Sequence, residues 1–116
     1  MADIWAEEFK VIPTMGNHDT YPQDTIKFHE KRSNENINMW SDTWTQFIDD
    51  DVEKNRWLDW GYYSIPLERK DGTKIGTNGN TKVFSLNTNF CYTYNWEVFS
   101  MYQDPAGILG WLQDEL

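Results

Sequence analysis

A short apolar run at residues 9–13 is closely followed by the polar tetrapeptide Gly16-Asn17-His18-Asp19. The apolar run predicts a short buried strand that ends at Pro13. Gly16 permits a tight turn, so an amide, an imidazole and a carboxylate emerge together at the strand end. The amide oxygen suits a hard metal ion, and the imidazole exchanges protons near neutral pH. The alternative interpretation is an ordinary polar turn.

A second segment, residues 83–89, is apolar at its start and polar at its end. This pattern is typical of a buried central strand that opens onto a site. Asn87 and Asn89 are therefore candidates to face the site, with capping and turn roles as the more common alternative for asparagine. An earlier strand is expected over residues 62–67, directly after the segment 56–60. Pro66 is expected to lie near the edge of this strand.

Apolar residues at steps of three and four positions predict a helix with one buried face. The members of this stripe are Ile37, Trp40, Trp44, Phe47 and Ile48. Ser33 or Asn34 is expected to cap the helix start, and the aspartates at 49–51 are expected to mark its end. A metal site built on those aspartates is the alternative, although consecutive side chains point in different directions.

The last residues of the chain predict a second helix with a clear beginning. Asp104 is expected to cap it and Pro105 to occupy its first turn. Its expected buried face consists of Ile108, Leu109, Trp111 and Leu112. The turn signals Asp71-Gly72 and Asn78-Gly79 predict an extended hairpin connection ahead of residue 83. Strands and helices in this order indicate a mixed α/β fold.

Aromatic residues are abundant, with seven Trp, six Tyr and six Phe in 116 residues. They can form a core in which fewer, larger side chains replace Leu and Val. The open alternatives are exposed aromatics that bind sugars or lipid, and aromatics that pack against segments absent from this chain. The net charge of −9 disfavours nucleic acid as a partner, because a phosphate-binding surface needs Lys and Arg. No apolar run approaches membrane-spanning length, which predicts no transmembrane segment.

The tetrapeptide is followed, in order, by residues 83–91, by Asp104-Pro105-Ala106-Gly107 and by residues 111–116. Together these blocks resemble the acid sphingomyelinase-like branch of the calcineurin-like metallophosphoesterases, and Gly61-Tyr62-Tyr63-Ser64 is also similar to that family. The resemblance implies two sheets packed as a sandwich and flanked by helices, incomplete in this chain. It also implies hydrolysis of phosphodiester bonds in a small molecule or a lipid, with sphingomyelin and nucleotide-type substrates both compatible.

The resemblance also implies roles for the residues of the tetrapeptide. In this family two divalent ions, expected here to be zinc, hold a bridging hydroxide in line with the phosphorus. Asn17 would bind one metal through its carboxamide oxygen, and His18 would donate a proton to the departing alkoxide. Asp19 would lie behind them and fix the loop.

The chain departs from the family pattern on both sides of the tetrapeptide. An early Asp-x-His, a Gly-Asp segment and a later Gly-His-x-His are absent, and the only histidines are His18 and His29. We therefore expect residues 1–116 to be an internal portion of one larger catalytic domain, inactive and with little or no tight metal binding by itself. His29 has no motif support and is expected to be a surface or partly buried residue.

Cys91 is the only cysteine, so no disulfide can form within the chain. The resemblance implies pairing with a cysteine further downstream, and the alternative is a small buried hydrophobe in a reducing compartment. The resemblance also implies a secreted or lysosomal protein. Other function classes stay open: a noncatalytic aromatic-rich binding module, and a pseudoenzyme scaffold that serves only protein contacts.

Overall fold

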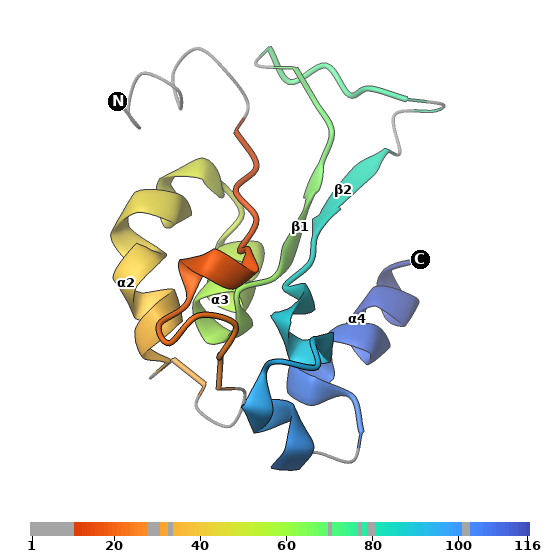
Figure 1. Cartoon of the computed structure of the whole chain (residues 1–116). Coiled ribbons are helices and arrows are strands. Elements are labelled where there is room, and N and C mark those ends of the chain that lie inside the picture. The colour runs from red at the N-terminus through yellow and green to blue at the C-terminus, as the bar shows by residue number, and fades with distance from the viewer. Residues whose placement is uncertain are drawn as a thin grey trace.

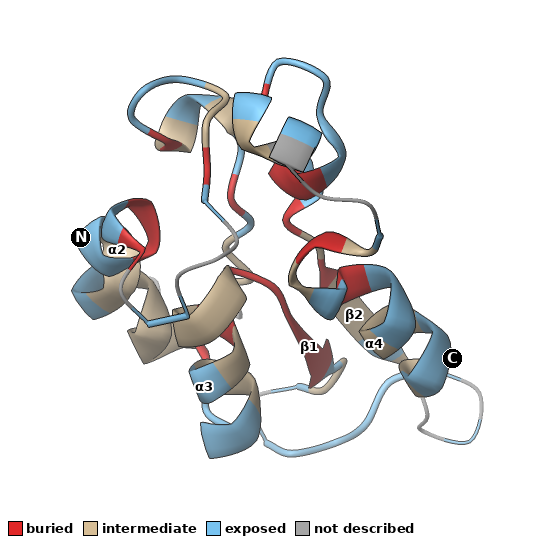
Figure 2. Ribbon diagram, turned by 90° about the horizontal axis from the view of Figure 1, so that it is seen from below, coloured by how far each residue is buried: buried red, intermediate tan, exposed pale blue. Residues whose placement is uncertain are grey.

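The computed structural model describes residues 11–27, 31–32, 34–69, 71–76, 78, 81–100 and 103–116. Its main elements are α2 (Glu35–Trp44), α3 (Asp51–Trp60), β1 (Tyr63–Pro66), β2 (Lys82–Ser85) and α4 (Ile108–Glu115). Short 3-10 helices lie at Asn17–Asp19, Thr45–Phe47, Thr88–Cys91, Trp96–Ser100 and Pro105–Gly107. In both Figure 1 and Figure 2, α2 and α3 lie on one side of the strands and α4 lies on the other.

The strands β1 and β2 are antiparallel neighbours, with Tyr63 opposite Ser85. β1 is buried over its first three residues (Figure 2). The connection between the strands contains a bridge from Glu68 to Lys74, which confirms the extended hairpin connection. The described residues form a single two-stranded sheet. A mixed α/β arrangement is therefore confirmed at the coarse level, and the two-sheet sandwich stays a prediction.

The first predicted strand is not observed. Residues 9 and 10 lie outside the described part of the chain, and residues 11–13 are not paired in a backbone ladder. Side chains hold this segment instead, because the Tyr63 and Ser85 hydroxyls donate to the Pro13 carbonyl at 2.8 and 3.1 Å. Burial raises the pKa of Tyr63, which keeps the phenol protonated as a donor. The segment before the tetrapeptide is thus anchored to the sheet by hydroxyl groups.

The strand predicted over residues 83–89 ends earlier than expected. β2 stops at Ser85, and a 3-10 helix over Thr88–Cys91 takes the place of its last residues. The side chains of Asn87 and Asn89 are buried and bond to backbone carbonyls of other segments. This use of the two amides replaces a regular continuation of the strand.

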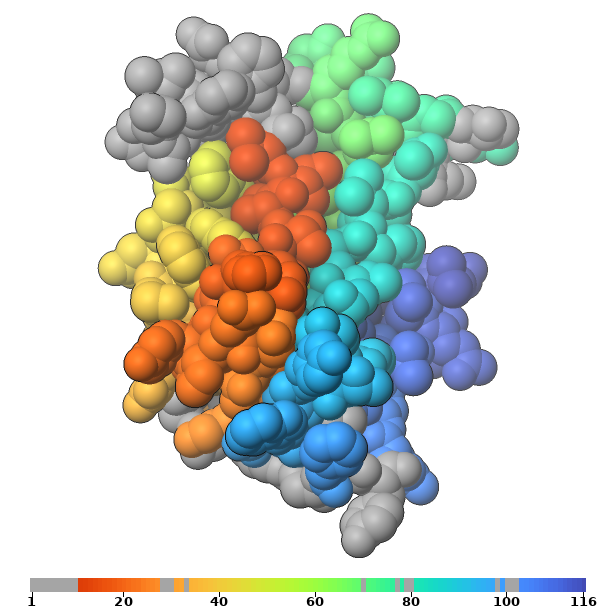
Figure 3. All heavy atoms as spheres, viewed as in Figure 1, coloured from red at the N-terminus to blue at the C-terminus, as the bar shows by residue number. Residues whose placement is uncertain are grey.

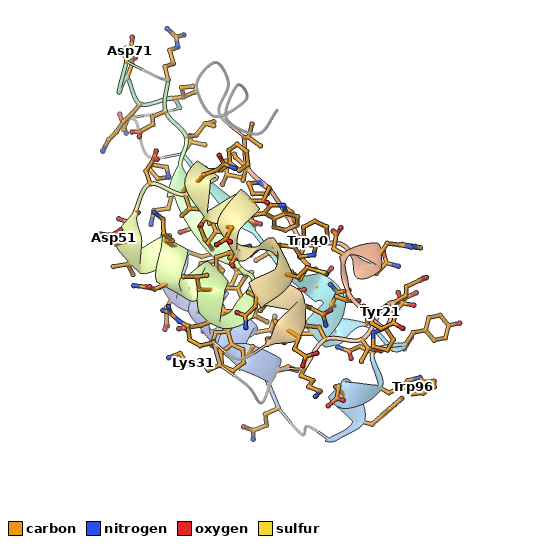
Figure 4. All side chains as sticks on the ribbon, turned by 90° about the vertical axis from the view of Figure 1, so that its left-hand side faces the viewer. Tyr21, Lys31, Trp40, Asp51, Asp71 and Trp96 are labelled. Atoms are coloured by element: carbon orange, nitrogen blue, oxygen red, sulfur yellow. The ribbon has the colours of Figure 1, made fainter. Side chains whose placement is uncertain are left out.

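The helix α2 confirms the predicted helix and its stripe as far as Trp44, and Phe47 and Ile48 follow in a 3-10 helix and at its end. The Asn34 side chain accepts hydrogen bonds from two backbone N–H groups of the first turn, so Asn34 is the N-cap. Ile37 is fully buried, and Trp40 stacks on Trp44 with ring centroids 5.6 Å apart. Trp40 also donates from its indole nitrogen to the Asp19 carbonyl, 2.9 Å away, and so joins α2 to the tetrapeptide (Figure 4).

The sequence patterns do not predict α3. The aspartates at 49–51, expected to end the preceding helix, begin α3 instead. Asp50 is the N-cap, and its carboxylate accepts the Glu53 backbone N–H at 3.0 Å. Asp51 lies in the first turn, where the helix dipole favours negative charge (Figure 4). Within the described ranges no group of three or more His, Cys, Asp or Glu side chains is placed to hold a metal, so the aspartate-site alternative gains no support.

The helix α4 differs from the prediction at its start and in its buried face. Pro105 lies in the separate 3-10 helix Pro105–Gly107 and Gly107 is the N-cap of α4, although Asp104 contributes its carboxylate to the first turn. The Asp104 carboxylate accepts the backbone N–H groups of Leu109 and Gly110, both at 2.8 Å. Ile108 is buried, whereas Leu109 is 57% exposed, so the predicted burial of Leu109 is wrong. The partly buried positions 111, 112 and 115 share one side of the helix with Ile108. Position 109 is rotated away from that side by about 100°.

The core between these elements is largely aromatic. Trp57 from α3, Tyr63 from β1 and Phe90 from the 3-10 helix after β2 are fully buried, which confirms the aromatic-core interpretation for these side chains. Other aromatic side chains are exposed, and they include Tyr21, Tyr94, Trp96 and Phe99. Over the described ranges, no helix has the length and apolar character needed to cross a membrane.

Candidate functional site

The tetrapeptide forms a turn that its own carboxylate closes. Oδ2 of Asp19 accepts the Gly16 N–H at 2.8 Å, and the Asp19 N–H donates to the Gly16 carbonyl at 3.2 Å. Gly16 has φ −97° and ψ 175°, which is ordinary extended backbone, so unusual dihedral angles do not explain this glycine. A Cβ at this position would lie 3.3 Å from Oδ2 of Asp19. The close approach of the carboxylate is therefore what favours glycine here.

A group of buried asparagines lies beneath the turn. Asn89 donates from Nδ2 to the Gly16 carbonyl at 3.2 Å and to Oδ1 of Asn87 at 3.0 Å. Asn87 donates to the Trp60 carbonyl at the end of α3, at 3.1 Å, and Asn95 donates to the Asn89 carbonyl at 2.9 Å. All three asparagines are at most 3% exposed. The turn is thus tied to α3 and to the segment after β2 through side-chain amides.

Asn17 is half-buried, and its side-chain amide is held at one end. Nδ2 of Asn17 donates to Oδ1 of Asp24 at 2.8 Å. Among the described residues no group donates a hydrogen bond to the side-chain oxygen of Asn17. The oxygen, which is the atom that could bind a cation or accept from a ligand, is therefore the end of the amide that remains available.

His18 is exposed and is less firmly held than its neighbours. Its Nε2 lies 3.5 Å from Nε2 of Gln23, a contact at the long limit for a hydrogen bond. Over the described part of the chain no carboxylate bonds to the imidazole. Within the described residues the imidazole is therefore exposed on the turn and has one weak neighbour.

A pocket of about 560 Å³ lies beside the turn. Its lining consists of Gly16, Asn17, Thr88, Asn89, Cys91 and Tyr92. Figure 3 shows the two parts of the chain that form it, in orange and light blue, side by side on one face. Cys91 is exposed with a free thiol, so the alternative of a buried hydrophobe is wrong. His18 is not among the lining residues, and it stands outside the pocket on the same turn.

The structure thus brings Asn17 and Asn89 to one pocket, while the Asp19 carboxylate bonds to the Gly16 N–H within the turn. His29 lies outside the described residues. Two further residues of the site are not predicted from the sequence. Asp24 accepts a hydrogen bond from the Asn17 side chain, and Asn95 donates one to the Asn89 carbonyl. No motif or periodic pattern in the sequence marks either residue, because its role is visible only from the hydrogen bond that it makes in the folded chain.

The described residues do not make a complete metal site. Asn17 offers one neutral oxygen of the kind that hard cations bind, but a single amide oxygen does not hold a divalent ion against water. No cluster of three or more His, Cys, Asp or Glu side chains accompanies it in the described ranges. We therefore assign no reaction step to a metal held by this chain alone.

Replacing Asn89 with Ala is expected to destabilise the chain by about 1–3 kcal/mol, because the Gly16 carbonyl and Oδ1 of Asn87 lose a buried donor. Urea unfolding measures the change. The matched control is Asn38→Ala at an exposed position of α2, which should stay within about 0.5 kcal/mol of the parent. Equal unfolding midpoints for the two variants would contradict the proposed role of the asparagine group.

No protein-family model matches this chain. Among curated proteins, the chain is 32% identical over 109 residues to sphingomyelinase phosphodiesterase C of Dictyostelium discoideum, covering 94% of the chain and 21% of that protein. It is 30% identical over 110 residues to the cyclic GMP-AMP phosphodiesterase SMPDL3A of Homo sapiens, covering 92% and 21%. Sphingomyelin phosphodiesterase B of Dictyostelium discoideum is 28% identical over 107 residues, covering 92% and 15%. The chain therefore spans about a fifth or less of the length of these relatives.

Proposed function

This chain is related to the acid sphingomyelinase-like phosphodiesterases over at least 92% of its length, and we propose that it is an internal portion of a phosphodiesterase catalytic domain. The observation that carries the proposal is the Asn17-His18 turn, held on buried asparagines at the edge of a pocket. A neutral oxygen and a proton-exchanging imidazole in adjacent positions suit the cleavage of a phosphodiester bond. In this proposal residues 1–116 are inactive alone.

His18 is the proposed proton donor. Its imidazole is exposed on the turn, and in this proposal it approaches the oxygen of a departing alkoxide. Protonation of that oxygen makes it a better leaving group and completes the cleavage of the P–O bond. Asp19 assists indirectly, since its carboxylate closes the turn that carries His18.

Asn17 is the proposed contribution of this chain to a metal centre of the longer protein. We propose two divalent ions, zinc in the first instance, and the support is the similarity to the family together with the available oxygen of Asn17. The remaining ligands would come from outside residues 1–116, because the described residues supply no cluster of their own. This chain by itself is expected to bind zinc weakly.

The proposed substrate is a small molecule or a lipid that contains a phosphodiester bond. The names of the relatives include sphingomyelin and cyclic GMP-AMP phosphodiesterases, and both bonds are of this class. The net charge of −9 does not favour a polymeric nucleic acid, which would be repelled. We therefore propose a monomeric substrate rather than a polymer.

The test uses the longer protein that includes residues 1–116. It is assayed for release of phosphocholine from sphingomyelin and for cleavage of cyclic GMP-AMP, with and without a chelator. Hydrolysis of at least one substrate, lost on chelation, is the expected result. Hydrolysis of neither, by a protein that is folded and supplied with zinc, would overturn the proposed function.

A noncatalytic binding module is the second candidate, and the exposed aromatic side chains favour it. Trp96 and Phe99 are 76% and 78% exposed, and Tyr92 and Tyr94 make an edge-to-face contact at 5.3 Å. Figure 4 shows Tyr21 and Trp96 projecting from the same side of the molecule. Saturable binding of a carbohydrate or of neutral lipid vesicles, without any hydrolysis and lost in Trp96→Ala, would favour this candidate over the enzyme.

A further inference from the structure

We infer that Asp24 is a positioning residue that sets which end of the Asn17 carboxamide faces the pocket. The inference rests on the proposed function, because it concerns how Asn17 would present its oxygen. Sequence reasoning assigns no role to Asp24, and the four residues between it and the tetrapeptide lie outside the motif. The structure alone brings the two side chains together.

Asn17 and Asp24 are joined by two hydrogen bonds of opposite direction. Nδ2 of Asn17 donates to Oδ1 of Asp24 at 2.8 Å, and the Asp24 backbone N–H donates to the Asn17 carbonyl at 3.0 Å. A carboxylate accepts only, so it selects the NH₂ end of the amide and excludes the oxygen end. The Asn17 oxygen must then point away from Asp24, and Asn17 itself lines the pocket.

The backbone of the loop keeps Asp24 in this place. Asp24 has φ 67°, in the left-handed region that few residues other than Gly, Asn and Asp adopt readily. The Thr20 hydroxyl donates to the carbonyls of Asn17 and Pro22, at 3.1 and 3.2 Å, and Thr20 is buried. A loop tied to Asn17 at several points and left-handed at Asp24 holds the acceptor against the amide.

Without this acceptor, the two ends of the Asn17 amide would differ little in energy. Rotation by half a turn would bring the NH₂ group to the pocket, where it repels a cation and competes as a donor for water. Outer partners of this kind typically change metal affinity or activity by about 10–100-fold when they are lost. We expect a decrease of that size in kcat of the longer protein, with a smaller change in KM.

The test compares Asp24→Gly with Asp24→Asn. Glycine accepts the left-handed backbone and removes the acceptor. Asparagine accepts the same backbone and keeps a side-chain oxygen, but its NH₂ group can equally donate to the Asn17 oxygen, so it retains a partner and only part of the selection. The control is Asn78→Gly, another residue with positive φ, 59°, in the connection between the strands. All are made in the longer protein and assayed for kcat and KM on its substrate.

A second readout does not depend on turnover. In ¹H–¹⁵N spectra of the metal-free protein, the side-chain NH₂ of Asn17 should show slowed solvent exchange in the parent, faster exchange in Asp24→Gly and intermediate exchange in Asp24→Asn. The expected result is a kcat loss of about 10–100-fold in Asp24→Gly, a smaller loss in Asp24→Asn, and no change in Asn78→Gly. Equal exchange rates and equal kcat in Asp24→Gly and the parent would overturn the inference. A parent without hydrolysis would contradict the proposed function instead, and the exchange measurement would still decide the role of Asp24.

Discussion

His18→Ala in the longer protein is expected to lower kcat by about 10²–10⁴-fold for a substrate with an alkoxide leaving group. The physical reason is that an alkoxide is a strong base and leaves readily only with a proton. His18 is exposed, so its loss should leave the free energy of unfolding within about 0.5 kcal/mol of the parent. Steady-state kinetics and urea unfolding, measured on the same preparations, separate the two effects.

The choice of leaving group makes this prediction specific. A p-nitrophenolate departs without protonation, so His18→Ala should affect a p-nitrophenyl diester much less than an alkyl diester. The matched control is Gln23→Ala, which removes the exposed neighbour of the imidazole and should have a small effect on both. Equal decreases in kcat for the two leaving groups would contradict proton donation by His18. An unchanged kcat on both substrates would show that His18 is not part of the site.

Trp57→Ala is expected to destabilise the chain by about 3–5 kcal/mol. Trp57 is fully buried, and its ring lies 5.7 Å from that of Trp44, with an interplanar angle of 53°. Its removal would open a large cavity where α2 and α3 meet. A shift of this size is a large fraction of the total stability of a small domain, and urea unfolding would show it directly.

Trp57→Phe is the informative companion variant. The indole Nε1 of Trp57 is buried without a hydrogen-bond partner among the described residues, so phenylalanine removes an unsatisfied donor together with part of the ring. We expect Trp57→Phe to be clearly less destabilising than Trp57→Ala. Trp96→Ala, at a position 76% exposed, should change the free energy of unfolding little. Equal losses in the Phe and Ala variants, or a large loss in Trp96→Ala, would contradict this description of the core.

The sequence predicts those elements whose signals are local. The stripe from Ile37 and the cap at Asn34 define α2, and the Asp104 carboxylate accepts from the first turn of α4 even though that helix begins three residues later than Pro105. α3 is not predictable in the same way, because Trp57 is its only buried residue and its apolar stripe is weak. The aspartates that cap α3 stand equally close to the end of the preceding helix, so the pattern alone does not decide between the two positions.

The candidate site divides in the same way. Asn17, His18 and Asp19 are identified by their motif, and their chemical roles stay predictions. The residues that support this turn are distant in sequence. Asn89 donates to the carbonyl of Gly16, 73 positions away, and Asn87 donates to the carbonyl of Trp60. Asp24 is close in sequence, and its carboxylate accepts from Asn17 in a loop whose backbone is left-handed at Asp24. Such contacts follow from the fold and leave no periodic trace in the sequence.

The relation to the acid sphingomyelinase-like phosphodiesterases, predicted from the motifs, is confirmed by the similarities to curated proteins. The exposed thiol of Cys91 at the pocket is compatible with its pairing to a cysteine of another segment, which stays a prediction. The aromatic residues divide between a buried core and an exposed group, of which Tyr92 lines the pocket. The buried group confirms the aromatic-core interpretation, and the role of the exposed group stays a prediction.

The most direct test of the account compares the 116-residue chain with the longer protein, using hydrolysis of bis(p-nitrophenyl) phosphate and zinc binding measured in parallel. The account predicts zinc-dependent hydrolysis by the longer protein, and neither turnover nor tight zinc binding by residues 1–116. Tight zinc binding together with turnover by the 116-residue chain alone would contradict it, because the described residues offer one suitable oxygen and no cluster of metal ligands.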